Sequence, residues 1–307
     1  MIEVREASPG EAQSWLDGWR ERLQAWYGGC SGETQWVSQK VERRLTRWHE
    51  ALGRHLFTVV AAGEPVGRLA LAEVDDPQAM LLADLWISPQ HRQRGYGREA
   101  VQWAIAFATE RADQITMVTA DDPAHDTVFG LFPVRAQIMM KALTPAIEQP
   151  EGVTGRPMTA HEFATWREEQ VVGYASDIAG SGLMSEAEAR ERSETQIDEL
   201  LPDGVHTPGH TFLCIEAEGE VVATNWLKHE YAPGTSFVFG VEVVSGNRGK
   251  GYGKAAMLLG EQVCLEAGDN QLGLNVFGQN SVAIGLYHKL DYVTVEKFRS
   301  LALTADH

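Results

Sequence analysis

Apolar and polar positions follow the same succession of patterns twice along the chain. Each half begins with charged sequence of helical character, at residues 11–55 and 159–201. Runs rich in β-branched and aromatic residues come next, broken by Gly-Glu pairs that start at Gly63 and Gly219. Such breaks are typical of hairpins. We therefore expect each half to place an antiparallel meander after its opening helices.

A change of period follows in both halves. Apolar residues recur every 3.6 positions over residues 97–113 and 253–269, which predicts two amphipathic helices. Each predicted helix comes directly after a glycine-rich turn, HRQRGYGR at 91–98 and NRGKGYGK at 247–254. The equivalent glycines are 156 positions apart. A fixed offset of this kind indicates an internal duplication.

The tails of the two halves differ. Strand-like runs follow both helices, at residues 115–121 and 271–277. Only the second half continues into a clear helical pattern, over residues 280–291, with Asn280 or Ser281 as the expected N-cap.

The repeat also predicts the domain organisation. Residues 144–156 contain prolines and glycines without periodicity, which is typical of a linker. The first domain then spans residues 1–143 and the second spans residues 157–307. The expected fold class is α+β, a tandem duplication in which each mixed, largely antiparallel sheet is flanked by helices.

A glycine-rich turn between a strand and a helix favours anion binding, because backbone N–H groups point outward at the helix N-terminus. The P-loop pattern G-x-x-x-x-G-K-[ST] fails, since Arg248 replaces its first glycine and Ala255 its hydroxyl residue. The dinucleotide pattern G-x-G-x-x-G/A matches both turns. However, each turn comes late, after a meander, whereas that pattern belongs at the first strand of its domain.

The remaining pattern is R-x-x-G-x-G after a strand. RGKGYG at 248–253, with LNVFGQNSVAIGLYHKLDY at 274–292, resembles the acetyl-CoA loop and C-terminal part of the GNAT acetyltransferase superfamily. The resemblance covers nearly the whole second half. The tandem layout is similar to that of mycothiol synthases. This resemblance implies acetyl-CoA as co-substrate and acetyl transfer to an amine.

The resemblance also implies which residues of the second half act. Strand residues would pair with the pantetheine arm, backbone amides of the turn would hold the pyrophosphate, and two asparagines would touch the cofactor. These residues are Val241, Val243, Arg248, Gly249, Lys250, Gly251, Tyr252, Gly253, Lys254, Asn275 and Asn280.

Two residues are candidates for proton transfer. Tyr287 would protonate the leaving thiolate, since a phenol of pKa about 10 can donate to a thiolate of pKa about 8.5 without large cost. Glu242 is the nearest carboxylate before the turn and would act as general base, directly or through water. A packed aromatic ring and a solvated glutamate are the alternative interpretations. His210, His229 and Glu230 are lesser candidates for the base.

The first half is interpreted as a degenerate copy. At an offset of 155, Phe132 replaces Tyr287 and His125 replaces Asn280. Pro123 stands at the expected helix entry, and Pro133 interrupts the helix that a counterpart of Tyr287 needs. A vestigial cofactor site would consist of Ile87, Arg92, Gly95, Tyr96 and Gly97.

Composition and charge limit the kinds of partner that this chain is expected to bind. Among 307 residues the formal net charge is −17, which argues against nucleic acid. The charge favours a cationic substrate, and solubility alone is the alternative interpretation. The N-terminus lacks a signal-peptide pattern and no run is long enough to cross a membrane, so a cytoplasmic protein is expected. The three cysteines lack metal or redox spacing, and no metal site is predicted. Both a monomer and a homodimer fit, since a tandem repeat can mimic a dimer.

Two functions remain in view. The first is an N-acetyltransferase that moves the acetyl group of acetyl-CoA to a primary amine of a small cationic molecule. The second is a non-catalytic protein that binds or senses acyl-CoA.

Overall fold

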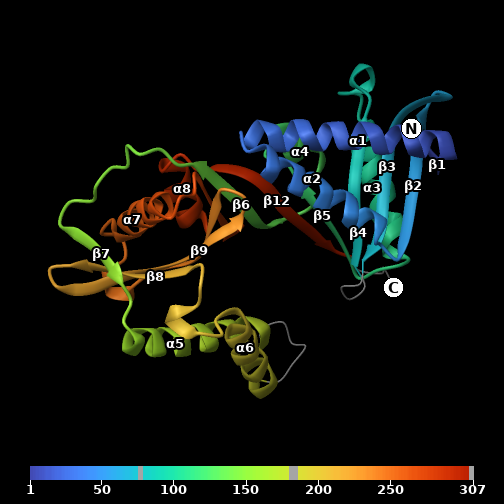
Figure 1. Cartoon of the computed structure of the whole chain (residues 1–307). Coiled ribbons are helices and arrows are strands. Elements are labelled where there is room, and N and C mark those ends of the chain that lie inside the picture. The colour runs from blue at the N-terminus through green and yellow to red at the C-terminus, as the bar shows by residue number, and fades with distance from the viewer. Residues whose placement is uncertain (75–78, 180–185, 304–307) are drawn as a thin grey trace. The chain divides into compact units, whose positions relative to one another are not determined.

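The computed structural model describes residues 1–74, 79–179 and 186–303 (Figure 1). The chain forms two compact units. Unit 1 comprises Met1–Lys141 with Asn275–His307, and unit 2 comprises Ala142–Leu274. The units differ from the linear halves drawn from the repeat, because the C-terminal segment of the second half belongs to unit 1.

Unit 1 contains the following elements in chain order: β1 (Glu3–Glu6), α1 (Pro9–Cys30), α2 (Thr34–His49), β2 (Gly53–Ala61), β3 (Glu64–Val74), β4 (Ala79–Ile87), α3 (Tyr96–Thr109), β5 (Gln114–Thr119), α4 (Pro123–Val128), β6 (Val134–Ala142), α8 (Ser281–Lys289) and β12 (Val293–Ala302).

Unit 2 contains β7 (Val153–Pro157), α5 (Ala160–Ala179), α6 (Glu186–Leu200), β8 (His210–Ala217), β9 (Glu220–Ala232), β10 (Thr235–Val243) and α7 (Tyr252–Glu266). Strand β11 (Gln271–Phe277) begins in unit 2 and ends in unit 1. The predicted mixture of helices and largely antiparallel strands is confirmed.

The sheet of unit 1 runs in the order β1-β2-β3-β4-β5-β12-β6. Strands β4 and β5 are parallel, and the other neighbours pair antiparallel. Strand β12 lies between β5 and β6. The last strand of the chain therefore completes the sheet of the first half.

A buried ion pair fixes β12 in this position. Glu296 is 6% exposed. Its carboxylate accepts a hydrogen bond from the Tyr27 hydroxyl at 2.6 Å and pairs with the Lys40 ammonium at 2.9 Å. Burial raises the pKa of Glu296, but Lys40 and Tyr27 outweigh this effect and the pKa is lowered. Helices α1 and α2 are thus bonded to a strand more than 240 residues away in sequence.

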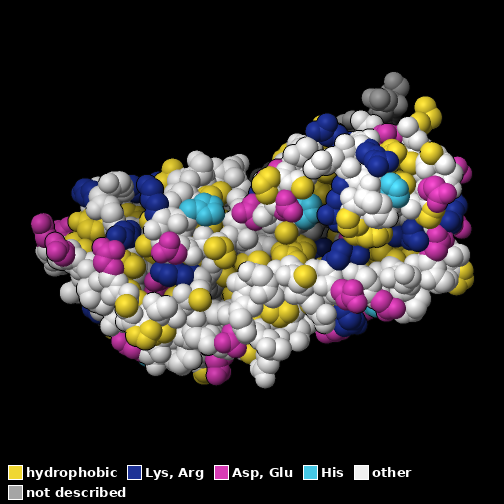
Figure 2. Space-filling model, turned by 90° about the horizontal axis from the view of Figure 1, so that it is seen from above, with side chains coloured by type: hydrophobic (Ala, Val, Ile, Leu, Met, Phe, Trp, Pro, Cys, Tyr) yellow, Lys and Arg dark blue, Asp and Glu magenta, His cyan; other side chains and the backbone are white. Residues whose placement is uncertain are grey.

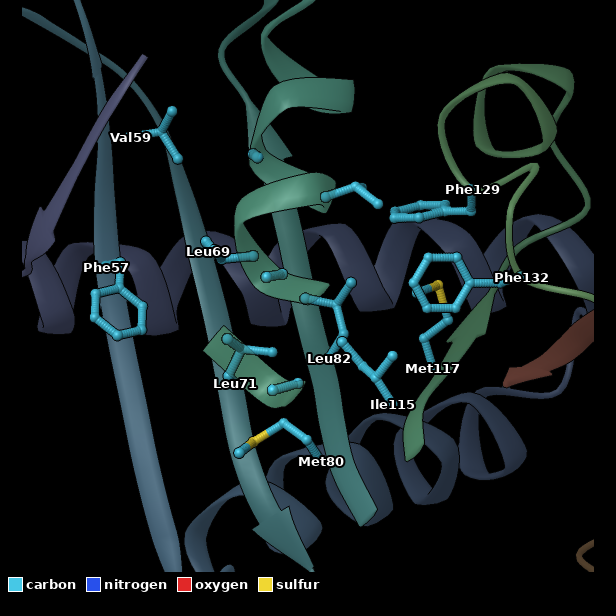
Figure 3. Packing of buried hydrophobic residues seen from close by; sticks show 14 of the residues in the cluster. Phe57, Val59, Leu69, Leu71, Met80, Leu82, Ile115, Met117, Phe129 and Phe132 are labelled. Carbon is cyan, nitrogen blue, oxygen red and sulfur yellow. The ribbon is translucent and has the colours of Figure 1, made fainter. Parts of the chain in front are cut away.

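The core of unit 1 lies between the sheet and α3. Figure 3 shows Phe57, Leu69, Leu71 and Leu82 pointing from the strands toward this helix. Helix α1 covers the opposite face, as the same view shows behind the strands. Its Glu11 bonds to Thr58, whose neighbour Phe57 faces the core. Neighbouring residues of a strand point to opposite faces, so β2 holds both layers.

Helix starts follow local sequence. Asn280 caps α8 by accepting a hydrogen bond from the Ala283 amide at 3.1 Å, which confirms one of the two expected caps. Helix α4 begins at Pro123, the expected position of helix entry. Pro123 occupies the first turn of α4, where its missing N–H is harmless, and Asp122 caps the helix. The helix nevertheless ends at Val128.

Unit 2 has the sheet order β11-β10-β9-β8-β7, with β10 and β11 parallel. One face packs on α7, where the Asn225 side chain donates to the Ala256 carbonyl at 2.9 Å. The other face packs on α5, where Trp166 contacts Trp226 and Phe212 with ring centroids 5.2 and 5.1 Å apart. Asn225 and Trp226 are consecutive, so β9 supplies both faces.

Candidate functional site

The two glycine turns are built alike. Each arginine folds back to donate from Nε to the last carbonyl of the preceding strand. Arg92 reaches the Ile87 carbonyl at 3.0 Å, and Arg248 reaches the Val243 carbonyl at 3.5 Å. A short 3₁₀ turn lies between strand and arginine in both copies. The duplication seen in sequence is therefore a duplication of backbone geometry.

Both turns end in a left-handed glycine that caps the following helix. Gly95 and Gly251 each have φ +88°. Two residues earlier the copies differ, because Gln93 adopts φ +61° where Gly249 has φ +79°. A side chain in this region is strained, whereas glycine is not. The first turn thus has a left-handed residue at the same position with glutamine in place of glycine.

The second turn fits a phosphate group. The first N–H groups of a helix have no partner within the helix and carry the positive end of its dipole. A Cβ added at Gly249 or Gly251 would meet nothing within 4 Å, so the space beside the backbone is open. The amides from Arg248 to Lys254 could hold the pyrophosphate of CoA there.

Each turn follows a β-bulge and a separation of two parallel strands. In unit 1, β4 pairs with β5 only up to Leu82, and Ala83 is an extra residue relative to β3. In unit 2, β10 pairs with β11 only up to Val238, and Phe239 is the extra residue relative to β9. Beyond these points the strand carrying the turn is free of its parallel neighbour, as an inserted extended ligand requires.

A cleft of about 1080 Å³ opens at the separated strands of unit 1. Its walls come from α1, the end of β4, the glycine turn and the segment from the end of β5 into α4. The lining includes Trp19, Arg22, Trp26, Arg44, Asp84, Trp86, Arg92, Gly95, Gly97, Arg98, Asp121, Asp122 and His125. Figure 2 shows a face that is hollowed where apolar, basic and histidine side chains gather. The first half therefore retains a cavity of ligand size.

An ion pair lies inside this cleft. Asp84 accepts hydrogen bonds from the Trp15 indole at 2.8 Å and from Arg22 at 2.5 Å. The Arg22 guanidinium also lies over the Trp86 ring, 5.4 Å from its centroid. Burial raises the pKa of Asp84, and Arg22 and Trp15 oppose the rise. Sequence reasoning missed these residues, because each is unremarkable until the fold brings α1 onto β4.

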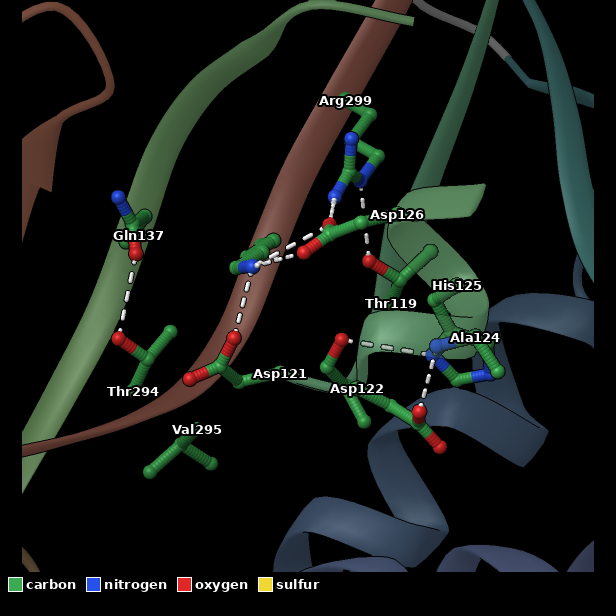
Figure 4. Close-up of polar contacts among 12 residues, drawn as sticks. Thr119, Asp121, Asp122, Ala124, His125, Asp126, Gln137, Thr294, Val295 and Arg299 are labelled. Carbon is green, nitrogen blue, oxygen red and sulfur yellow. Dashed lines mark hydrogen bonds and ion pairs between the residues drawn. The ribbon is translucent and has the colours of Figure 1, made fainter. Parts of the chain in front are cut away.

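Strand β12 bonds to the segment that runs from the end of β5 into α4, part of which lines the cleft (Figure 4). Arg299 donates to the Thr119 hydroxyl at 3.2 Å and also bonds to Asp126 of α4. Lys297 pairs with Asp126 at 3.1 Å and with Asp121 at 2.7 Å. Asp121 and Asp126 of the DDPAHD segment are thus paired with the last strand of the chain, whereas Asp122 caps α4.

Tyr287 and Phe132 differ in environment as well as in chemistry. Phe132 is 1% exposed and belongs to the core cluster of unit 1, where Figure 3 shows it beside Met117 and Phe129. Tyr287 lies on α8 and is only partly buried, with its ring 5.9 Å from that of Tyr292. Burial raises the pKa of Tyr287, so its hydroxyl keeps its proton at neutral pH.

Glu242 lies on the face of β10 that is opposite α7. It pairs across the sheet with Thr224, whereas its neighbour Val241 pairs with Asn225, which bonds to α7. The Glu242 carboxylate is exposed and accepts a long hydrogen bond from Gln170 of α5 at 3.5 Å. An exposed carboxylate with a weak partner can accept a proton.

The histidine candidates for the base are engaged elsewhere. His229 is bonded through both ring nitrogens, to Thr211 at 2.8 Å and to Ser236 at 2.9 Å. His210 accepts a hydrogen bond from the Trp226 indole at 2.9 Å, and burial lowers its pKa to about 4. Glu230 is exposed. Among the acids and histidines proposed, Glu242 keeps the most suitable position.

The predicted residues of the second half fall in both units. Val241, Val243 and the turn from Arg248 to Lys254 belong to unit 2. Asn275, Asn280 and Tyr287 belong to unit 1, on the end of β11 and on α8. Their roles toward a ligand stay predictions. The described part of the chain contains no helix long and apolar enough to cross a membrane.

Comparisons with known proteins agree with this geometry. The Acetyltransferase (GNAT) family matches residues 16–128 and 179–292. The uncharacterized N-acetyltransferase YdgE of Bacillus subtilis is 30% identical over 138 residues, covering 44% of this chain and 88% of that protein. A mycothiol acetyltransferase of Saccharomonospora viridis is 29% identical over 252 residues, covering 77% of this chain and 78% of that protein.

A solved structure supports the fold over the whole length. The GCN5-related N-acetyltransferase of Sphaerobacter thermophilus covers 99% of this chain and 96% of its own, with a TM-score of 0.51 and 19% sequence identity. The family match includes both glycine turns and stops short of β6 and β12. With two GNAT matches that together span most of its length, the chain belongs to the GNAT family of N-acetyltransferases, which use acetyl-CoA.

Proposed function

We propose that the chain transfers the acetyl group of acetyl-CoA to a primary amine of a small molecule, and that the second half performs the chemistry. Glycine at both left-handed positions of the second turn supports this assignment, because the backbone there is unstrained and open. The acidity of the chain favours a substrate that carries a positive charge before it reacts.

The proposed reaction is a direct attack. Glu242 takes a proton from the ammonium group, directly or through water, and the free amine attacks the thioester carbonyl. A C–N bond forms and the C–S bond breaks. Tyr287 gives its proton to the departing CoA thiolate, so that the products are an acetamide and CoA with a free thiol. A backbone N–H of the Val241–Val243 strand would polarise the carbonyl.

The contrast between Tyr287 and Phe132 carries this proposal. The two residues occupy equivalent places in the repeat, but only Tyr287 has a proton to give. Tyr287 is also partly accessible, whereas Phe132 is locked in a core. Asn280 caps α8 through its side-chain oxygen and keeps its amide group for donation.

Release of the CoA thiol, measured with acetyl-CoA and a panel of primary amines, tests the proposal. We expect amine-dependent release with at least one member of the panel. Calorimetry with acetyl-CoA provides the independent check of binding. Absence of acetyl-CoA binding would rule out the proposed function.

A second function has support from the first-half cleft. A chain that binds acyl-CoA without turnover, as a sensor, would use the cavity of about 1080 Å³ and the preserved first turn. The residues Ile87, Arg92, Gly95, Tyr96 and Gly97 lie along this cleft, as a cofactor site there requires. Tight acetyl-CoA binding without thiol release for any amine would favour this function over transfer.

A further inference from the structure

The face of unit 2 that carries Glu242 also carries a group of aromatic rings. Tyr231, Phe237 and Phe239 form a continuous wall, with centroids 4.5 Å apart for Tyr231 and Phe237 and 5.9 Å apart for Phe237 and Phe239. Tyr231 is 47% exposed and Phe239 is 37% exposed. We call these three residues the aromatic wall.

Trp226 and His210 pack against Phe239 of the aromatic wall. Trp226 is buried and lies 4.9 Å from Phe239. The Trp226 indole donates to His210, whose own ring lies 6.0 Å from Phe239. The lowered pKa of His210 keeps this imidazole uncharged at neutral pH, so it does not repel a cation.

A gap separates the wall from the carboxylate. Gly240 directly follows Phe239. Glu242 lies two residues after Gly240 and therefore on the same face of β10 as Gly240. A Cβ added at Gly240 would meet nothing within 4 Å, so the surface between the Phe239 ring and the Glu242 carboxylate is open. We call this surface the floor. Lys228 stands opposite Phe237, at the far end of the wall from Glu242. Positive charge on a ligand is therefore favoured at the Glu242 end.

The first half has a different surface at the equivalent positions. Ala83, Asp84 and Trp86 correspond to Phe239, Gly240 and Glu242 at the offset of 156. There the floor position holds the Asp84 carboxylate, which is bound by Arg22 and Trp15. The open space between an aromatic wall and an exposed carboxylate is thus a feature of the second half.

We propose that this surface is the acceptor subsite, and that the acceptor is a primary amine with an aromatic or bulky apolar body. The ammonium group lies over Gly240 beside Glu242, and the apolar body packs on Phe239 and Tyr231. Ring faces attract cations and apolar groups alike, so both parts of such a ligand are stabilised. The inference rests on the proposed function and selects this class over polyamines and amino sugars.

Calorimetry on the full chain tests the subsite without any chemistry. The chain is saturated with CoA, which has no acetyl group to give, and titrated with 2-phenylethylamine or with ethylamine. The two ligands share the ammonium group and differ in the ring. Burial of the ring should make 2-phenylethylamine bind about 10- to 100-fold more tightly.

Variants locate the effect. Phe239→Ser should abolish most of the preference for 2-phenylethylamine, and Tyr231→Ser, on the exposed hairpin, provides a second variant in case the first does not fold. Glu242→Gln should weaken both amines by the same factor, because both carry the charge. Leu52→Ser, which changes an exposed apolar residue of unit 1, should leave both affinities unchanged.

The outcomes are distinct. Equal affinity for the two amines, or a preference that survives both wall substitutions, overturns the subsite. Sedimentation that shows a dimer broken by Phe239→Ser, with the preference unchanged, would identify the wall as a contact between copies and also overturns it. Preferential binding without thiol release from acetyl-CoA would contradict the proposed function and leave the subsite supported.

Discussion

The two halves share a glycine-rich turn of the same backbone geometry and differ in what surrounds it. Both place a bulge, a strand separation, a folded-back arginine and a left-handed glycine in the same order. Apart from the arginine side chain, these features depend on backbone and glycine alone. The second half adds the partly buried Tyr287 and an open floor at Gly240, where the first has Phe132 and Asp84. The backbone geometry of the turn is therefore common to both halves, whereas the side chains around it are not.

The order of the strands in the sheet also differs from their order in the sequence. The last strand of the second half completes the sheet of the first half and binds its helices through Glu296. The same strand engages the segment that follows β5 through Lys297 and Arg299. This interlocking gives a structural reason to retain the first half, because β12, the last strand of the chain, pairs with β5 and β6 of the first half.

The largest expected effect comes from the residue that distinguishes the halves. Tyr287→Phe removes the proposed proton donor and keeps the ring, so kcat should fall by about 10²- to 10⁴-fold with little change in KM for acetyl-CoA. Steady-state thiol release gives both constants. Phe132→Leu is the matched substitution in the first half. It should lower stability through lost packing and leave kcat within about twofold. A kcat of wild-type size in Tyr287→Phe contradicts the assignment.

The next effect concerns the strand that links the halves. Glu296→Gln leaves Lys40 without its buried partner, so the free energy of unfolding should fall by about 2 to 4 kcal/mol. Urea denaturation measures this change. Glu148→Gln breaks the exposed pair with Lys254 and should change stability by less than about 1 kcal/mol. Similar values for the two variants would show that the buried pair does not fasten β12.

The stability of unit 2 should depend on pH through His210. Burial lowers the pKa of His210 to about 4, below its unfolded value of about 6.5. The unfolded chain therefore binds more protons between these values, and the stabilisation present above pH 6.5 is lost as pH falls toward 4. The effect is on the order of 1 to 3 kcal/mol, reduced by partial exposure.

The variant His210→Asn keeps an acceptor for the Trp226 indole and cannot titrate. Melting temperatures from pH 4 to 7 should therefore depend less on pH in this variant than in the parent chain. Parallel curves for the two proteins would show that His210 is not the group responsible.

The smallest expected effect is in the turns themselves. Gln93→Gly gives the first turn a glycine at the position of Gly249. The change relieves a backbone strain of about 1 kcal/mol at φ +61°. It also costs roughly 0.5 to 1 kcal/mol, because glycine loses more conformational entropy on folding. Stability should change by less than about 1 kcal/mol. The reciprocal Gly249→Gln should destabilise by about 1 kcal/mol. A larger loss in Gln93→Gly would mean that the Gln93 side chain makes a stabilising contact.

Sequence patterns were sufficient for features that local chemistry specifies. The helix after each turn, the hairpins at the Gly-Glu pairs and the Asn280 cap follow from periodicity and from residue preferences. The short helix α4 has no clear apolar period in the sequence, although Pro123 stands at the expected helix entry and a first-turn proline is compatible with a helix. Strands β6 and β12 were missed because nothing in a local pattern indicates that they pair with segments far away in the chain.

Parts of the candidate site were hidden for a similar reason. Asp84 and Arg22 lie 62 residues apart and show their pairing only when α1 packs on β4. The aromatic wall depends on a bulge at Phe239, and a bulge shifts the face of a residue without a sequence signature. The conformation of the turns was predictable, because glycine is the residue that left-handed φ values favour.

The central claim is that both halves keep a phosphate cradle and only the second half catalyses. Gly95 and Gly251 provide a matched pair, since both have φ +88° and both cap a helix. Aspartate is among the side chains that tolerate this conformation, and its charge would repel the pyrophosphate. The measurement is kcat/KM for acetyl-CoA in Gly251→Asp and Gly95→Asp. The account predicts near-complete loss in Gly251→Asp and a change of less than about twofold in Gly95→Asp, whereas loss of turnover in Gly95→Asp with full activity in Gly251→Asp would contradict it.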